Sequence, residues 1–247
     1  MSYCFVIPNY NHTQGFADLI AHLAQQGQPI IIVNDASNEE TSNTINRVAE
    51  QQSLVQVLTH EVNQGKGGAV QTGLLYAHQQ GHSHAIQVDA DGQHDLHDIA
   101  RLTQLSKQYP NALVSGAPVY DESVPKLRYF ARFITHFWVT VETLSLQLKD
   151  TMCGFRVYPL AACHQLFNRV SLGKRMDFDI EVMVRLYWQG VECRFLPTKV
   201  IYPEDGVSHF NALDDNLRIS WMHTRLCFGA LIRVPKLLWR NLQRWSS

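Results

Sequence analysis

The sequence predicts an α/β fold in which a mostly parallel central sheet is sandwiched by helices. Three observations predict it. Short runs rich in β-branched residues alternate with amphipathic helical stripes through the first half of the chain. The runs are apolar throughout, which is typical of parallel strands covered on both faces. With 247 residues and 45% hydrophobic content, the chain can bury one substantial core, which favours one α/β domain over two.

The predicted strands of the first half are short and are separated by helical patterns. Phe16, Leu19, Ile20 and Leu23 repeat with the spacing of one helix face. Similar stripes cover residues 69–78 and 96–108, and the strands are predicted at residues 4–7, 30–33, 55–58, 85–88 and 112–114. The second half is less regular. Its patterns predict a long helix at 126–148, a polar-to-extended segment at 150–158, a helix at 178–188 and a strand at 191–196.

Composition bears on the compartment and the partners. The five cysteines are scattered without C-x-x-C spacing, which fits neither a disulfide framework nor a zinc site. We therefore expect a reducing, cytoplasmic compartment, and we expect no nucleic-acid partner. The first residues form a strand-like segment rather than a signal sequence, and no run of about twenty apolar residues predicts a membrane-spanning helix.

Four polar loops are predicted at one edge of the sheet. In parallel sheets ligands bind beyond the carboxyl ends of the strands, so these loops mark the candidate site. They comprise Pro8, Asn9, Tyr10 and Asn11 after the first strand, residues 34–37 after the second, residues 63–68 before a helix, and Asp89, Asp91 and Gln93 after the strand at 85–88.

The acidic loop is the most informative of the four. The carboxylates of Asp89 and Asp91 and the amide of Gln93 are hard oxygen ligands, which suit Mg²⁺ or Mn²⁺ carrying a phosphorylated substrate. A D-x-D pattern alone is also a common acidic turn after a strand.

Asp35 and Lys66 each have two possible roles, one in binding a nucleotide and one in the local structure. Asp35 can accept hydrogen bonds from a nucleobase or ribose, or it can be a turn or helix-capping residue. Lys66 lies among glycines at a helix start and can place an ammonium on a diphosphate, although the loop before it is also a generic turn. The loop matches neither a Walker A motif nor G-x-G-x-x-G, which disfavours P-loop and dinucleotide sites.

In order and spacing, these loops resemble the family 2 glycosyltransferases of GT-A fold. Residues 150–156, DTMCGFR, look like the D-x-x-S-G-F-R segment of the dolichyl-phosphate mannose synthase-like branch. Residues 202–210 and the tryptophan-rich helix after them look like bacterial members that act on cell-envelope lipids. The resemblance covers roughly residues 3 to 210.

The resemblance implies a GT-A fold and a nucleotide-diphosphate sugar as donor. It places Asp35 on the nucleoside, Asp89 and Asp91 at the diphosphate and its metal ion, and Gln93 as a further metal ligand. A divalent cation there stabilises the charge that develops on the leaving diphosphate. Lys66 and the arginines Arg128, Arg132 and Arg156 can add positive charge. A surface ion pair is the alternative for each arginine, and we favour it for Arg132 but not for Arg156.

Two positions depart from the family pattern. Where the family usually has two acids after the second strand, this chain has Asn34 before Asp35. In the segment that resembles G-x-S-K/R, His209 replaces the cation, so any phosphate contact there would be weaker or pH-dependent.

The candidates for a catalytic base are Asp177, Asp179 and Glu181. An inverting displacement by a sugar hydroxyl needs a carboxylate on the face opposite the leaving group. Acids are also favoured in a first helical turn by the helix dipole alone, and Glu181 can pair with Arg185. If the acceptor were a lipid phosphate, which is already anionic, no strong base would be required.

Residues 211–247 are predicted to form a basic amphipathic helical tail after a catalytic domain at 1–210. The segment after Asp215 carries six cations and no acid, interleaved with tryptophan and leucine. That pattern is typical of an interfacial helix at an anionic membrane, although the helix could instead pack on the domain or on a partner subunit. We expect Pro235 to break or kink it.

These expectations describe a metal-dependent, inverting glycosyltransferase that acts on a lipid-linked or glycolipid acceptor at the cytoplasmic membrane face. A nucleotidyltransferase is the first alternative, but it normally carries a glycine-rich basic loop where this chain has residues 8–11. The second is a non-catalytic, sugar-nucleotide-binding subunit for membrane recruitment. The retained Asp89, Asp91 and Gln93 argue against it, while the unidentified base leaves it open.

Overall fold

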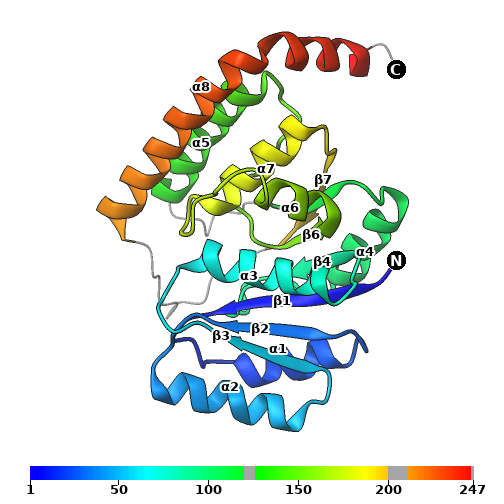
Figure 1. Ribbon diagram of the computed structural model, residues 1–247, viewed down its shortest axis with the longest axis vertical. Helices are drawn as coiled ribbons and strands as arrows, with labels where there is room; N and C mark the ends of the chain where they lie inside the picture. The colour runs from blue at the N-terminus through cyan, green and yellow to red at the C-terminus, as the bar shows by residue number, and fades with distance from the viewer. Residues whose placement is uncertain (120–125, 200–210, 246–247) are drawn as a thin grey trace.

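The computed structural model describes residues 1–119, 126–199 and 211–245. Within these residues seven strands form one sheet in the order β3-β2-β1-β4-β6-β5-β7 (Figure 1). The strands are β1 (Tyr3–Asn9), β2 (Ile30–Asn34), β3 (Val55–Thr59), β4 (His84–Gln87), β5 (Leu113–Pro118), β6 (Arg156–Pro159) and β7 (Cys193–Thr198).

The sheet is mostly parallel, as predicted. Strands β1 to β4 pair in parallel, and so do β5 and β7. Strand β6 lies between β4 and β5 and runs antiparallel to both. The polar ends of β1, β2 and β4 therefore lie at one edge, next to the turn that leads into β6.

Helices cover both faces of the sheet (Figure 1). One face is covered by α1 (Phe16–Ala24), α2 (Glu39–Gln51) and α4 (Asp98–Gln108). The other is covered by α3 (Lys66–Gln79), α6 (Leu160–Phe167) and α7 (Phe178–Gln189). Beyond α7 lies an outer layer of α5 (Lys126–Thr143) and α8 (Ala212–Trp245).

Each central strand supplies side chains to two cores, which explains its unbroken apolar sequence. In β1, Val6 faces the core under α3, whereas Phe5 and Ile7 face the core under α1. Gly73 lets α3 approach the sheet closely, because a Cβ at that position would lie 2.4 Å from the Val6 side chain.

Three elements differ from the sequence prediction. The helix expected at 126–148 ends at Thr143, and Leu144 adopts a left-handed φ of 51°, which no continuing helix allows. Helices α2 and α6 were not predicted. In α2 only Thr41, Ile45 and Val48 are buried, so its apolar stripe is too sparse to detect, and it is fixed by Asn38, whose side chain accepts a hydrogen bond from Thr41 N.

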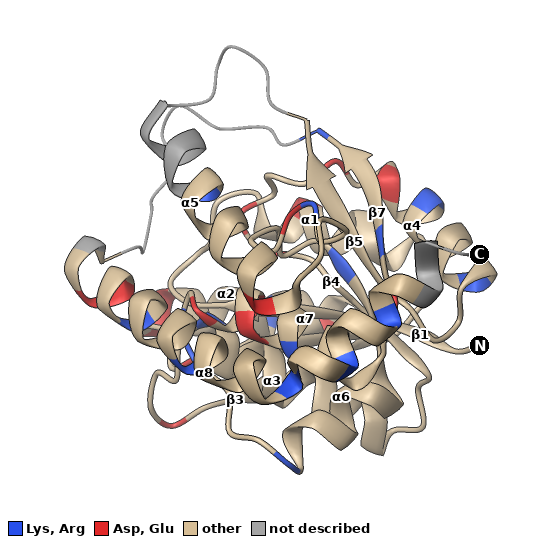
Figure 2. Ribbon diagram, turned by 90° about the horizontal axis from the view of Figure 1, so that it is seen from above, with Lys and Arg blue, Asp and Glu red and all other residues tan. Residues whose placement is uncertain are grey.

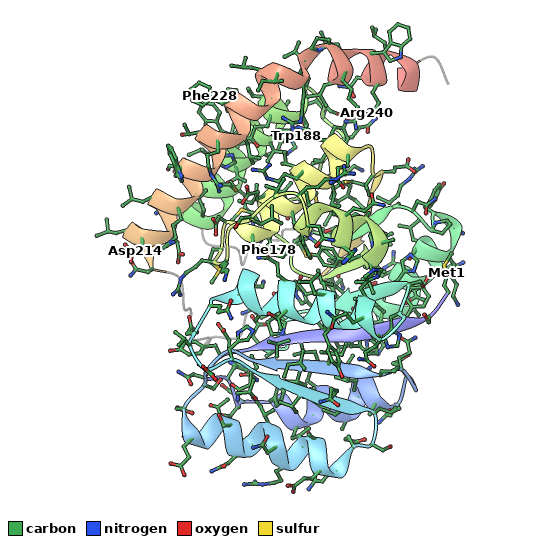
Figure 3. The ribbon with its side chains drawn as sticks, viewed as in Figure 1. Met1, Phe178, Trp188, Asp214, Phe228 and Arg240 are labelled. Atoms are coloured by element: carbon green, nitrogen blue, oxygen red, sulfur yellow. The ribbon has the colours of Figure 1, made fainter. Side chains whose placement is uncertain are left out.

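Helix α8 continues through Pro235 but changes direction between Phe228 and Arg240 (Figure 3). Of the two predicted effects of Pro235, a break or a kink, the helix shows the kink, since proline removes one backbone donor. Helix α8 packs on α5 and α7. Among the described residues, no helix combines the length and apolar character needed to cross a bilayer.

Candidate active site

The loops after β1 and β2 are held together by hydrogen bonds. The carbonyl of Asn9 accepts from Asp35 N, and the Asn9 side chain closes its own turn onto His12. Asn11 adopts a left-handed φ of 50°, and its side-chain oxygen accepts from Asn38 N at 2.7 Å. Tyr10 between them is exposed. Of the predicted donor-binding residues at the end of β1, Tyr10 and Asn11 are exposed, while Pro8 and Asn9 are buried.

Asp35 is buried, and both oxygens of its carboxylate bond to other groups of the protein. Its oxygens accept from Gln64 N at 2.8 Å and from Gly65 N at 2.7 Å, and they bond to His60 Nδ1 at 2.6 Å. These contacts fix the loop that begins α3. Asp35 thus shapes the place predicted for the nucleotide, and in this state its carboxylate is directed at the loop rather than at solvent.

The loop of residues 173–178 lies across the first turn of α3. Gly68 N donates to the carbonyl of Lys174 at 2.9 Å, and a Cβ at Gly67 would lie 2.3 Å from the Cβ of Phe178. Only glycine permits that approach. The close packing directs Lys66 toward the sheet edge, where its side chain meets two acids.

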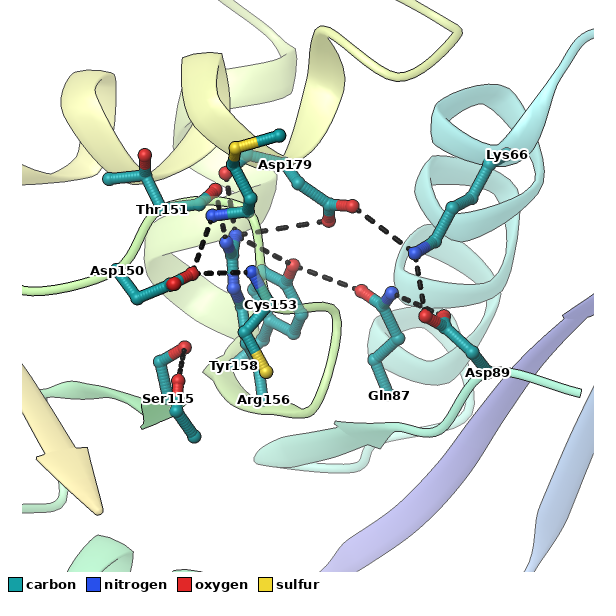
Figure 4. Close-up of polar contacts among 12 residues, drawn as sticks. Lys66, Gln87, Asp89, Ser115, Asp150, Thr151, Cys153, Arg156, Tyr158 and Asp179 are labelled. Carbon is teal, nitrogen blue, oxygen red and sulfur yellow. Dashed lines mark hydrogen bonds and ion pairs between the residues drawn. The ribbon is translucent and has the colours of Figure 1, made fainter. Parts of the chain in front are cut away.

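Asp89 and Asp179 share the Lys66 ammonium (Figure 4). Lys66 Nζ lies 2.7 Å from Asp89 Oδ2 and 3.3 Å from Asp179 Oδ2. Burial lowers the pKa of Lys66, but the charges of Asp179 and Asp89 raise it by more, so its pKa lies above the ordinary value. Burial raises the pKa of Asp89, but Lys66 and His94 lower it by more, so this acid stays ionised.

The acidic loop was predicted to hold a metal ion through Asp89, Asp91 and Gln93. In the described part of the chain, no three His, Cys, Asp or Glu side chains are arranged as a metal cluster. Asp91 is exposed, and its Oδ1 accepts from Gln93 N at 3.1 Å. The residues nevertheless fit a hard divalent cation, because Asp89 already binds a positive charge and the neighbouring Asp91 carboxylate is open to solvent.

The structure separates the three candidate bases. Asp179 faces Lys66, and its Oδ1 accepts no hydrogen bond from the described residues, with Arg156 Nη1 3.9 Å away. Asp177 instead accepts from Arg175 N at 3.1 Å. Glu181 is fully buried and accepts from Gly173 N and from Arg185 at 2.8 Å each. The structure thus brings Asp179, and neither of the other two, to Asp89.

The arginines of the prediction take different places. Arg156 is fully buried, and it donates to the carbonyls of Asp179 and Thr151 at 2.7 Å each (Figure 4). It therefore positions the segment that carries Asp179. Arg132 pairs with Asp150 as the ion-pair alternative expected, but the pair is partly buried rather than at the surface. Arg128 lies in α5, but its side chain is outside the described residues, as is His209.

Sequence reasoning missed three residues around Asp89 and Asp35. Gln87 is fully buried, donates to Asp89 Oδ1 at 3.1 Å and accepts from the Tyr158 hydroxyl at 3.0 Å. A polar residue inside an apolar strand, two positions before Asp89, was the available signal. Gly154 lies against the pair, since a Cβ there would be 2.7 Å from Asp89 Oδ2 and 2.8 Å from Lys66 Nζ. His60, the partner of Asp35, carried no sequence signal.

Comparison with known proteins identifies the family. The model of the family described as glycosyl transferase family 2 matches residues 4–174, more than half of the chain and all of the strand-end loops described above. The chain belongs to glycosyltransferase family 2. This confirms the resemblance to family 2 that was drawn from the motifs.

Among curated proteins, the chain is 30% identical over 200 residues to the dolichyl-phosphate beta-glucosyltransferase ALG5D of Trichomonas vaginalis. The match covers 73% of this chain and 60% of the relative, so the family 2 chain spans less than two thirds of that protein.

Solved structures confirm the GT-A fold. S. aureus TarS 1-349 in complex with UDP superposes with a TM-score of 0.64 at 16% identity, covering 92% of this chain and 65% of the other. Glucosyl-3-phosphoglycerate synthase from Mycobacterium tuberculosis, in complex with Mn²⁺ and UDP-glucose, gives a TM-score of 0.60 at 14% identity, covering 94% and 78%. At these identities the likeness concerns the fold.

Proposed function

We propose that this chain transfers a sugar from a nucleotide-diphosphate donor to a lipid-phosphate acceptor at the cytoplasmic face of a membrane, with inversion and with Mg²⁺ or Mn²⁺. The observation that carries the proposal is the Asp89–Lys66–Asp179 arrangement at the carboxyl edge of a family 2 sheet. The name of the Trichomonas relative supports the lipid-phosphate acceptor. The UDP and Mn²⁺ of the structural neighbours support the donor and the metal.

Asp89 and Asp91, with Gln93, would hold the divalent cation. When bound, the cation neutralises the charge that accumulates on the departing diphosphate. Lys66 supplies a fixed ammonium at the same place, because two carboxylates keep it protonated and the first turn of α3 keeps it oriented. Such preorganised charge stabilises the transition state more than the ground state.

Asp179 is the residue proposed to receive a proton from the acceptor. Its Oδ1 is buried yet accepts no hydrogen bond among the described residues, so it retains a lone pair for an incoming group. Arg156 fixes the backbone of Asp179 through its carbonyl. A phosphate monoester has its second pKa near 6, so at and below that pH part of the acceptor carries a proton for Asp179 to remove, whereas the dianion that prevails at higher pH needs no base.

A cavity lined in part by Thr151, whose carbonyl accepts from Arg156, supports an anionic acceptor. It has a volume of about 150 Å³ and lies between α5 and the 149–152 turn. Arg132, His136 and Lys149 line it together with apolar groups of Phe133 and Met152, and so does Asp150, whose carboxylate pairs with Arg132. The ammonium of Lys149 next to apolar groups suits the phosphate and the first carbons of a lipid.

Donor binding tests the first half of the proposal. We expect one of UDP-, GDP- or dTDP-glucose and -mannose to raise the melting temperature only when Mn²⁺ is present, because a ligand that binds the folded state stabilises it. Asp91→Ala should abolish this shift. Asp95→Ala on the same loop is the matched control, since Asp95 contacts His97 and no residue of the site, and it should keep the shift.

Transfer tests the second half. Wild-type protein, the stabilising donor and a polyprenyl phosphate in detergent should yield a glycosylated lipid and free nucleoside diphosphate. Pyrophosphate as the product would indicate nucleotidyl transfer instead. Donor binding without turnover on any lipid phosphate or glycolipid would refute the enzyme and favour a binding subunit.

A further inference from the structure

The outer helices α5 and α8 expose an unusual number of large apolar side chains. In α5, Phe133 is 64% exposed and Phe137 56% exposed. In α8, Phe228 is 67% exposed and Ile232 83% exposed. We call the whole set the outer apolar face; its members are Phe133, Ile134, Phe137, Trp138 and Val141 of α5 and Leu213, Leu217, Trp221, Phe228, Leu231, Ile232, Leu238, Trp239 and Leu242 of α8.

In α8 the exposed and the packed apolar residues form two separate stripes. Trp221, Phe228, Ile232 and Trp239 are spaced by seven, four and seven residues, which places them on one side of the helix. Met222, Leu226, Ala230 and Leu237 form the opposite stripe and are buried. Packing on the domain thus explains the apolar side chains of the buried stripe of α8, but it does not explain those of the exposed stripe.

The exposed stripes of α5 and α8 point the same way. Helices α5, α7 and α8 each pack against the other two, so α5 and α8 lie side by side on α7. Glu142 of α5 bonds to His223 of α8 at 2.7 Å, and Trp188 of α7 donates to the Glu142 carbonyl. The sides of α5 and α8 turned away from α7 therefore form one surface, with Phe228 outside and Trp188 inside (Figure 3).

The charge around this surface is positive. Over the sequence of α5 and α8 there are nine Lys and Arg residues and three acids. Glu142 and Asp215 are buried, which leaves Asp214 as the exposed acid among the described side chains of the two helices. Arg218 and Lys236 are exposed, and lysines and arginines lie along α8 (Figure 2).

Three other cations of α8 are turned inward instead. Arg225 approaches Glu181 at 3.4 Å, Arg233 lies over Trp188, and Arg240 lies over Tyr187. These three contacts hold α8 against α7, so the apolar side of α8 is exposed while the helix stays packed on the domain.

We infer that the outer apolar face is a bilayer-docking surface, on which α5 and α8 together lie in the plane of an anionic lipid membrane. The inference rests on the proposed function in that a lipid acceptor requires the chain to work at a membrane. Exposed Trp and Phe flanked by cations, with one exposed acid, match the chemistry of an anionic lipid–water interface. A second copy of the chain fits less well, because a two-fold contact through this face would bring two positively charged surfaces together.

The face also reaches the candidate acceptor cavity. Phe133 belongs both to the outer apolar face and to the cavity lined by Arg132 and Lys149. Docking through α5 as well as α8 would therefore bring the lipid surface to the mouth of that cavity, which α8 alone would not do.

Vesicle binding without donor or acceptor tests the inference independently of catalysis. We compare phosphatidylcholine vesicles with vesicles that also contain about one third phosphatidylglycerol, and we expect at least about tenfold stronger binding to the latter. Phe137→Glu on α5 and Phe228→Glu on α8 should each weaken that binding about tenfold. Arg218→Glu combined with Lys236→Glu should weaken it by a similar factor and leave binding to phosphatidylcholine unchanged.

Val62→Glu is the matched control, since Val62 is 73% exposed in the loop before α3 and lies outside both helices. It should bind vesicles like the wild type, and all variants should keep the wild-type melting temperature.

No binding of the wild type, or equal binding of all variants, would overturn the inference. An effect of Phe228→Glu without one of Phe137→Glu would reduce the surface to α8 and refute the two-helix form. A dimer in solution that Phe228→Glu dissociates, without vesicle binding, would assign the face to self-association. Transfer in detergent that persists while vesicle binding fails would refute the docking surface and leave the proposed transfer reaction intact.

Discussion

Asp179 and Glu181, two residues apart in the first turn of α7, are both buried carboxylates beside cations, yet their surroundings differ. Glu181 receives donors on both oxygens, from Gly173 N, Arg185 and Arg225. Asp179 shares Lys66 with Asp89 and keeps one oxygen without a hydrogen bond from the described residues. A carboxylate whose two oxygens both accept hydrogen bonds, such as that of Glu181, stabilises the fold. A carboxylate that keeps an unused lone pair next to a second charged group, such as that of Asp179, is available for chemistry.

The largest effect is expected for Asp89→Asn. The substitution keeps the size of the side chain but removes the charge that holds Lys66 and, in the proposed function, the metal. We expect the rate of transfer to fall about 10³-fold. Steady-state rates with saturating donor measure it, and a variant with more than a tenth of wild-type activity would contradict the role given to Asp89.

Asp179→Asn should lower kcat about 10²-fold below about pH 6, where the acceptor phosphate still carries a proton that the amide cannot accept, and should leave donor affinity within about twofold. Donor affinity is measured by calorimetry in the presence of Mn²⁺. Unchanged kcat would show that the acceptor needs no base and that the unused oxygen of Asp179 has no catalytic part.

Glu181→Gln should have the opposite effects to Asp179→Asn: it should lower the stability of the fold and leave kcat unchanged. Removing a fully buried charge leaves two arginines without their partner, which we expect to cost about 3 kcal/mol of unfolding free energy. The kcat of the folded fraction should stay near that of the wild type. Glu192→Gln is the control, because Glu192 pairs with Arg194 at the surface and should change the stability by less than about 0.5 kcal/mol.

The smallest effect is expected at Glu142, the buried acid between α5 and α8. Burial raises its pKa above the ordinary 4.5, against the opposing effect of His223. Because the folded pKa is the higher one, the stability that the protonated acid contributes is lost as the pH rises above 4.5. Glu142→Gln lacks this loss, so its stability relative to the wild type should increase with pH in urea titrations. A constant difference would refute the assignment.

The sequence predicted most of the regular elements because their signals are local. Alternation of apolar runs and stripes located β1 to β5 within a few residues. The antiparallel direction of β6 was not predicted. The strand has four residues between a turn and a helix, and so short a sequence does not indicate which strands it pairs with or in which direction. The end of α5 was placed too late because Leu144 continues the apolar pattern while its backbone leaves the helix.

At the site, residue types could be predicted but their partners could not. Loop motifs indicated Asp35, Lys66 and Asp89, yet only tertiary packing aims Asp35 at the α3 loop and directs Lys66 between two acids. The choice among the three acids of α7 was partly accessible. Residues two apart on a helix point to different sides, so Asp179 and Glu181 could never have faced the same site.

Strand β6 has one further use. Val157 lies opposite Ile86 of β4 and Val114 of β5, so its backbone bridges the part of the sheet built from β1 to β4 and the part built from β5 and β7. Because successive N–H groups of a strand point to opposite neighbours, deuterium uptake at alternate residues of this short strand should report separately on its pairing with each of the two parts.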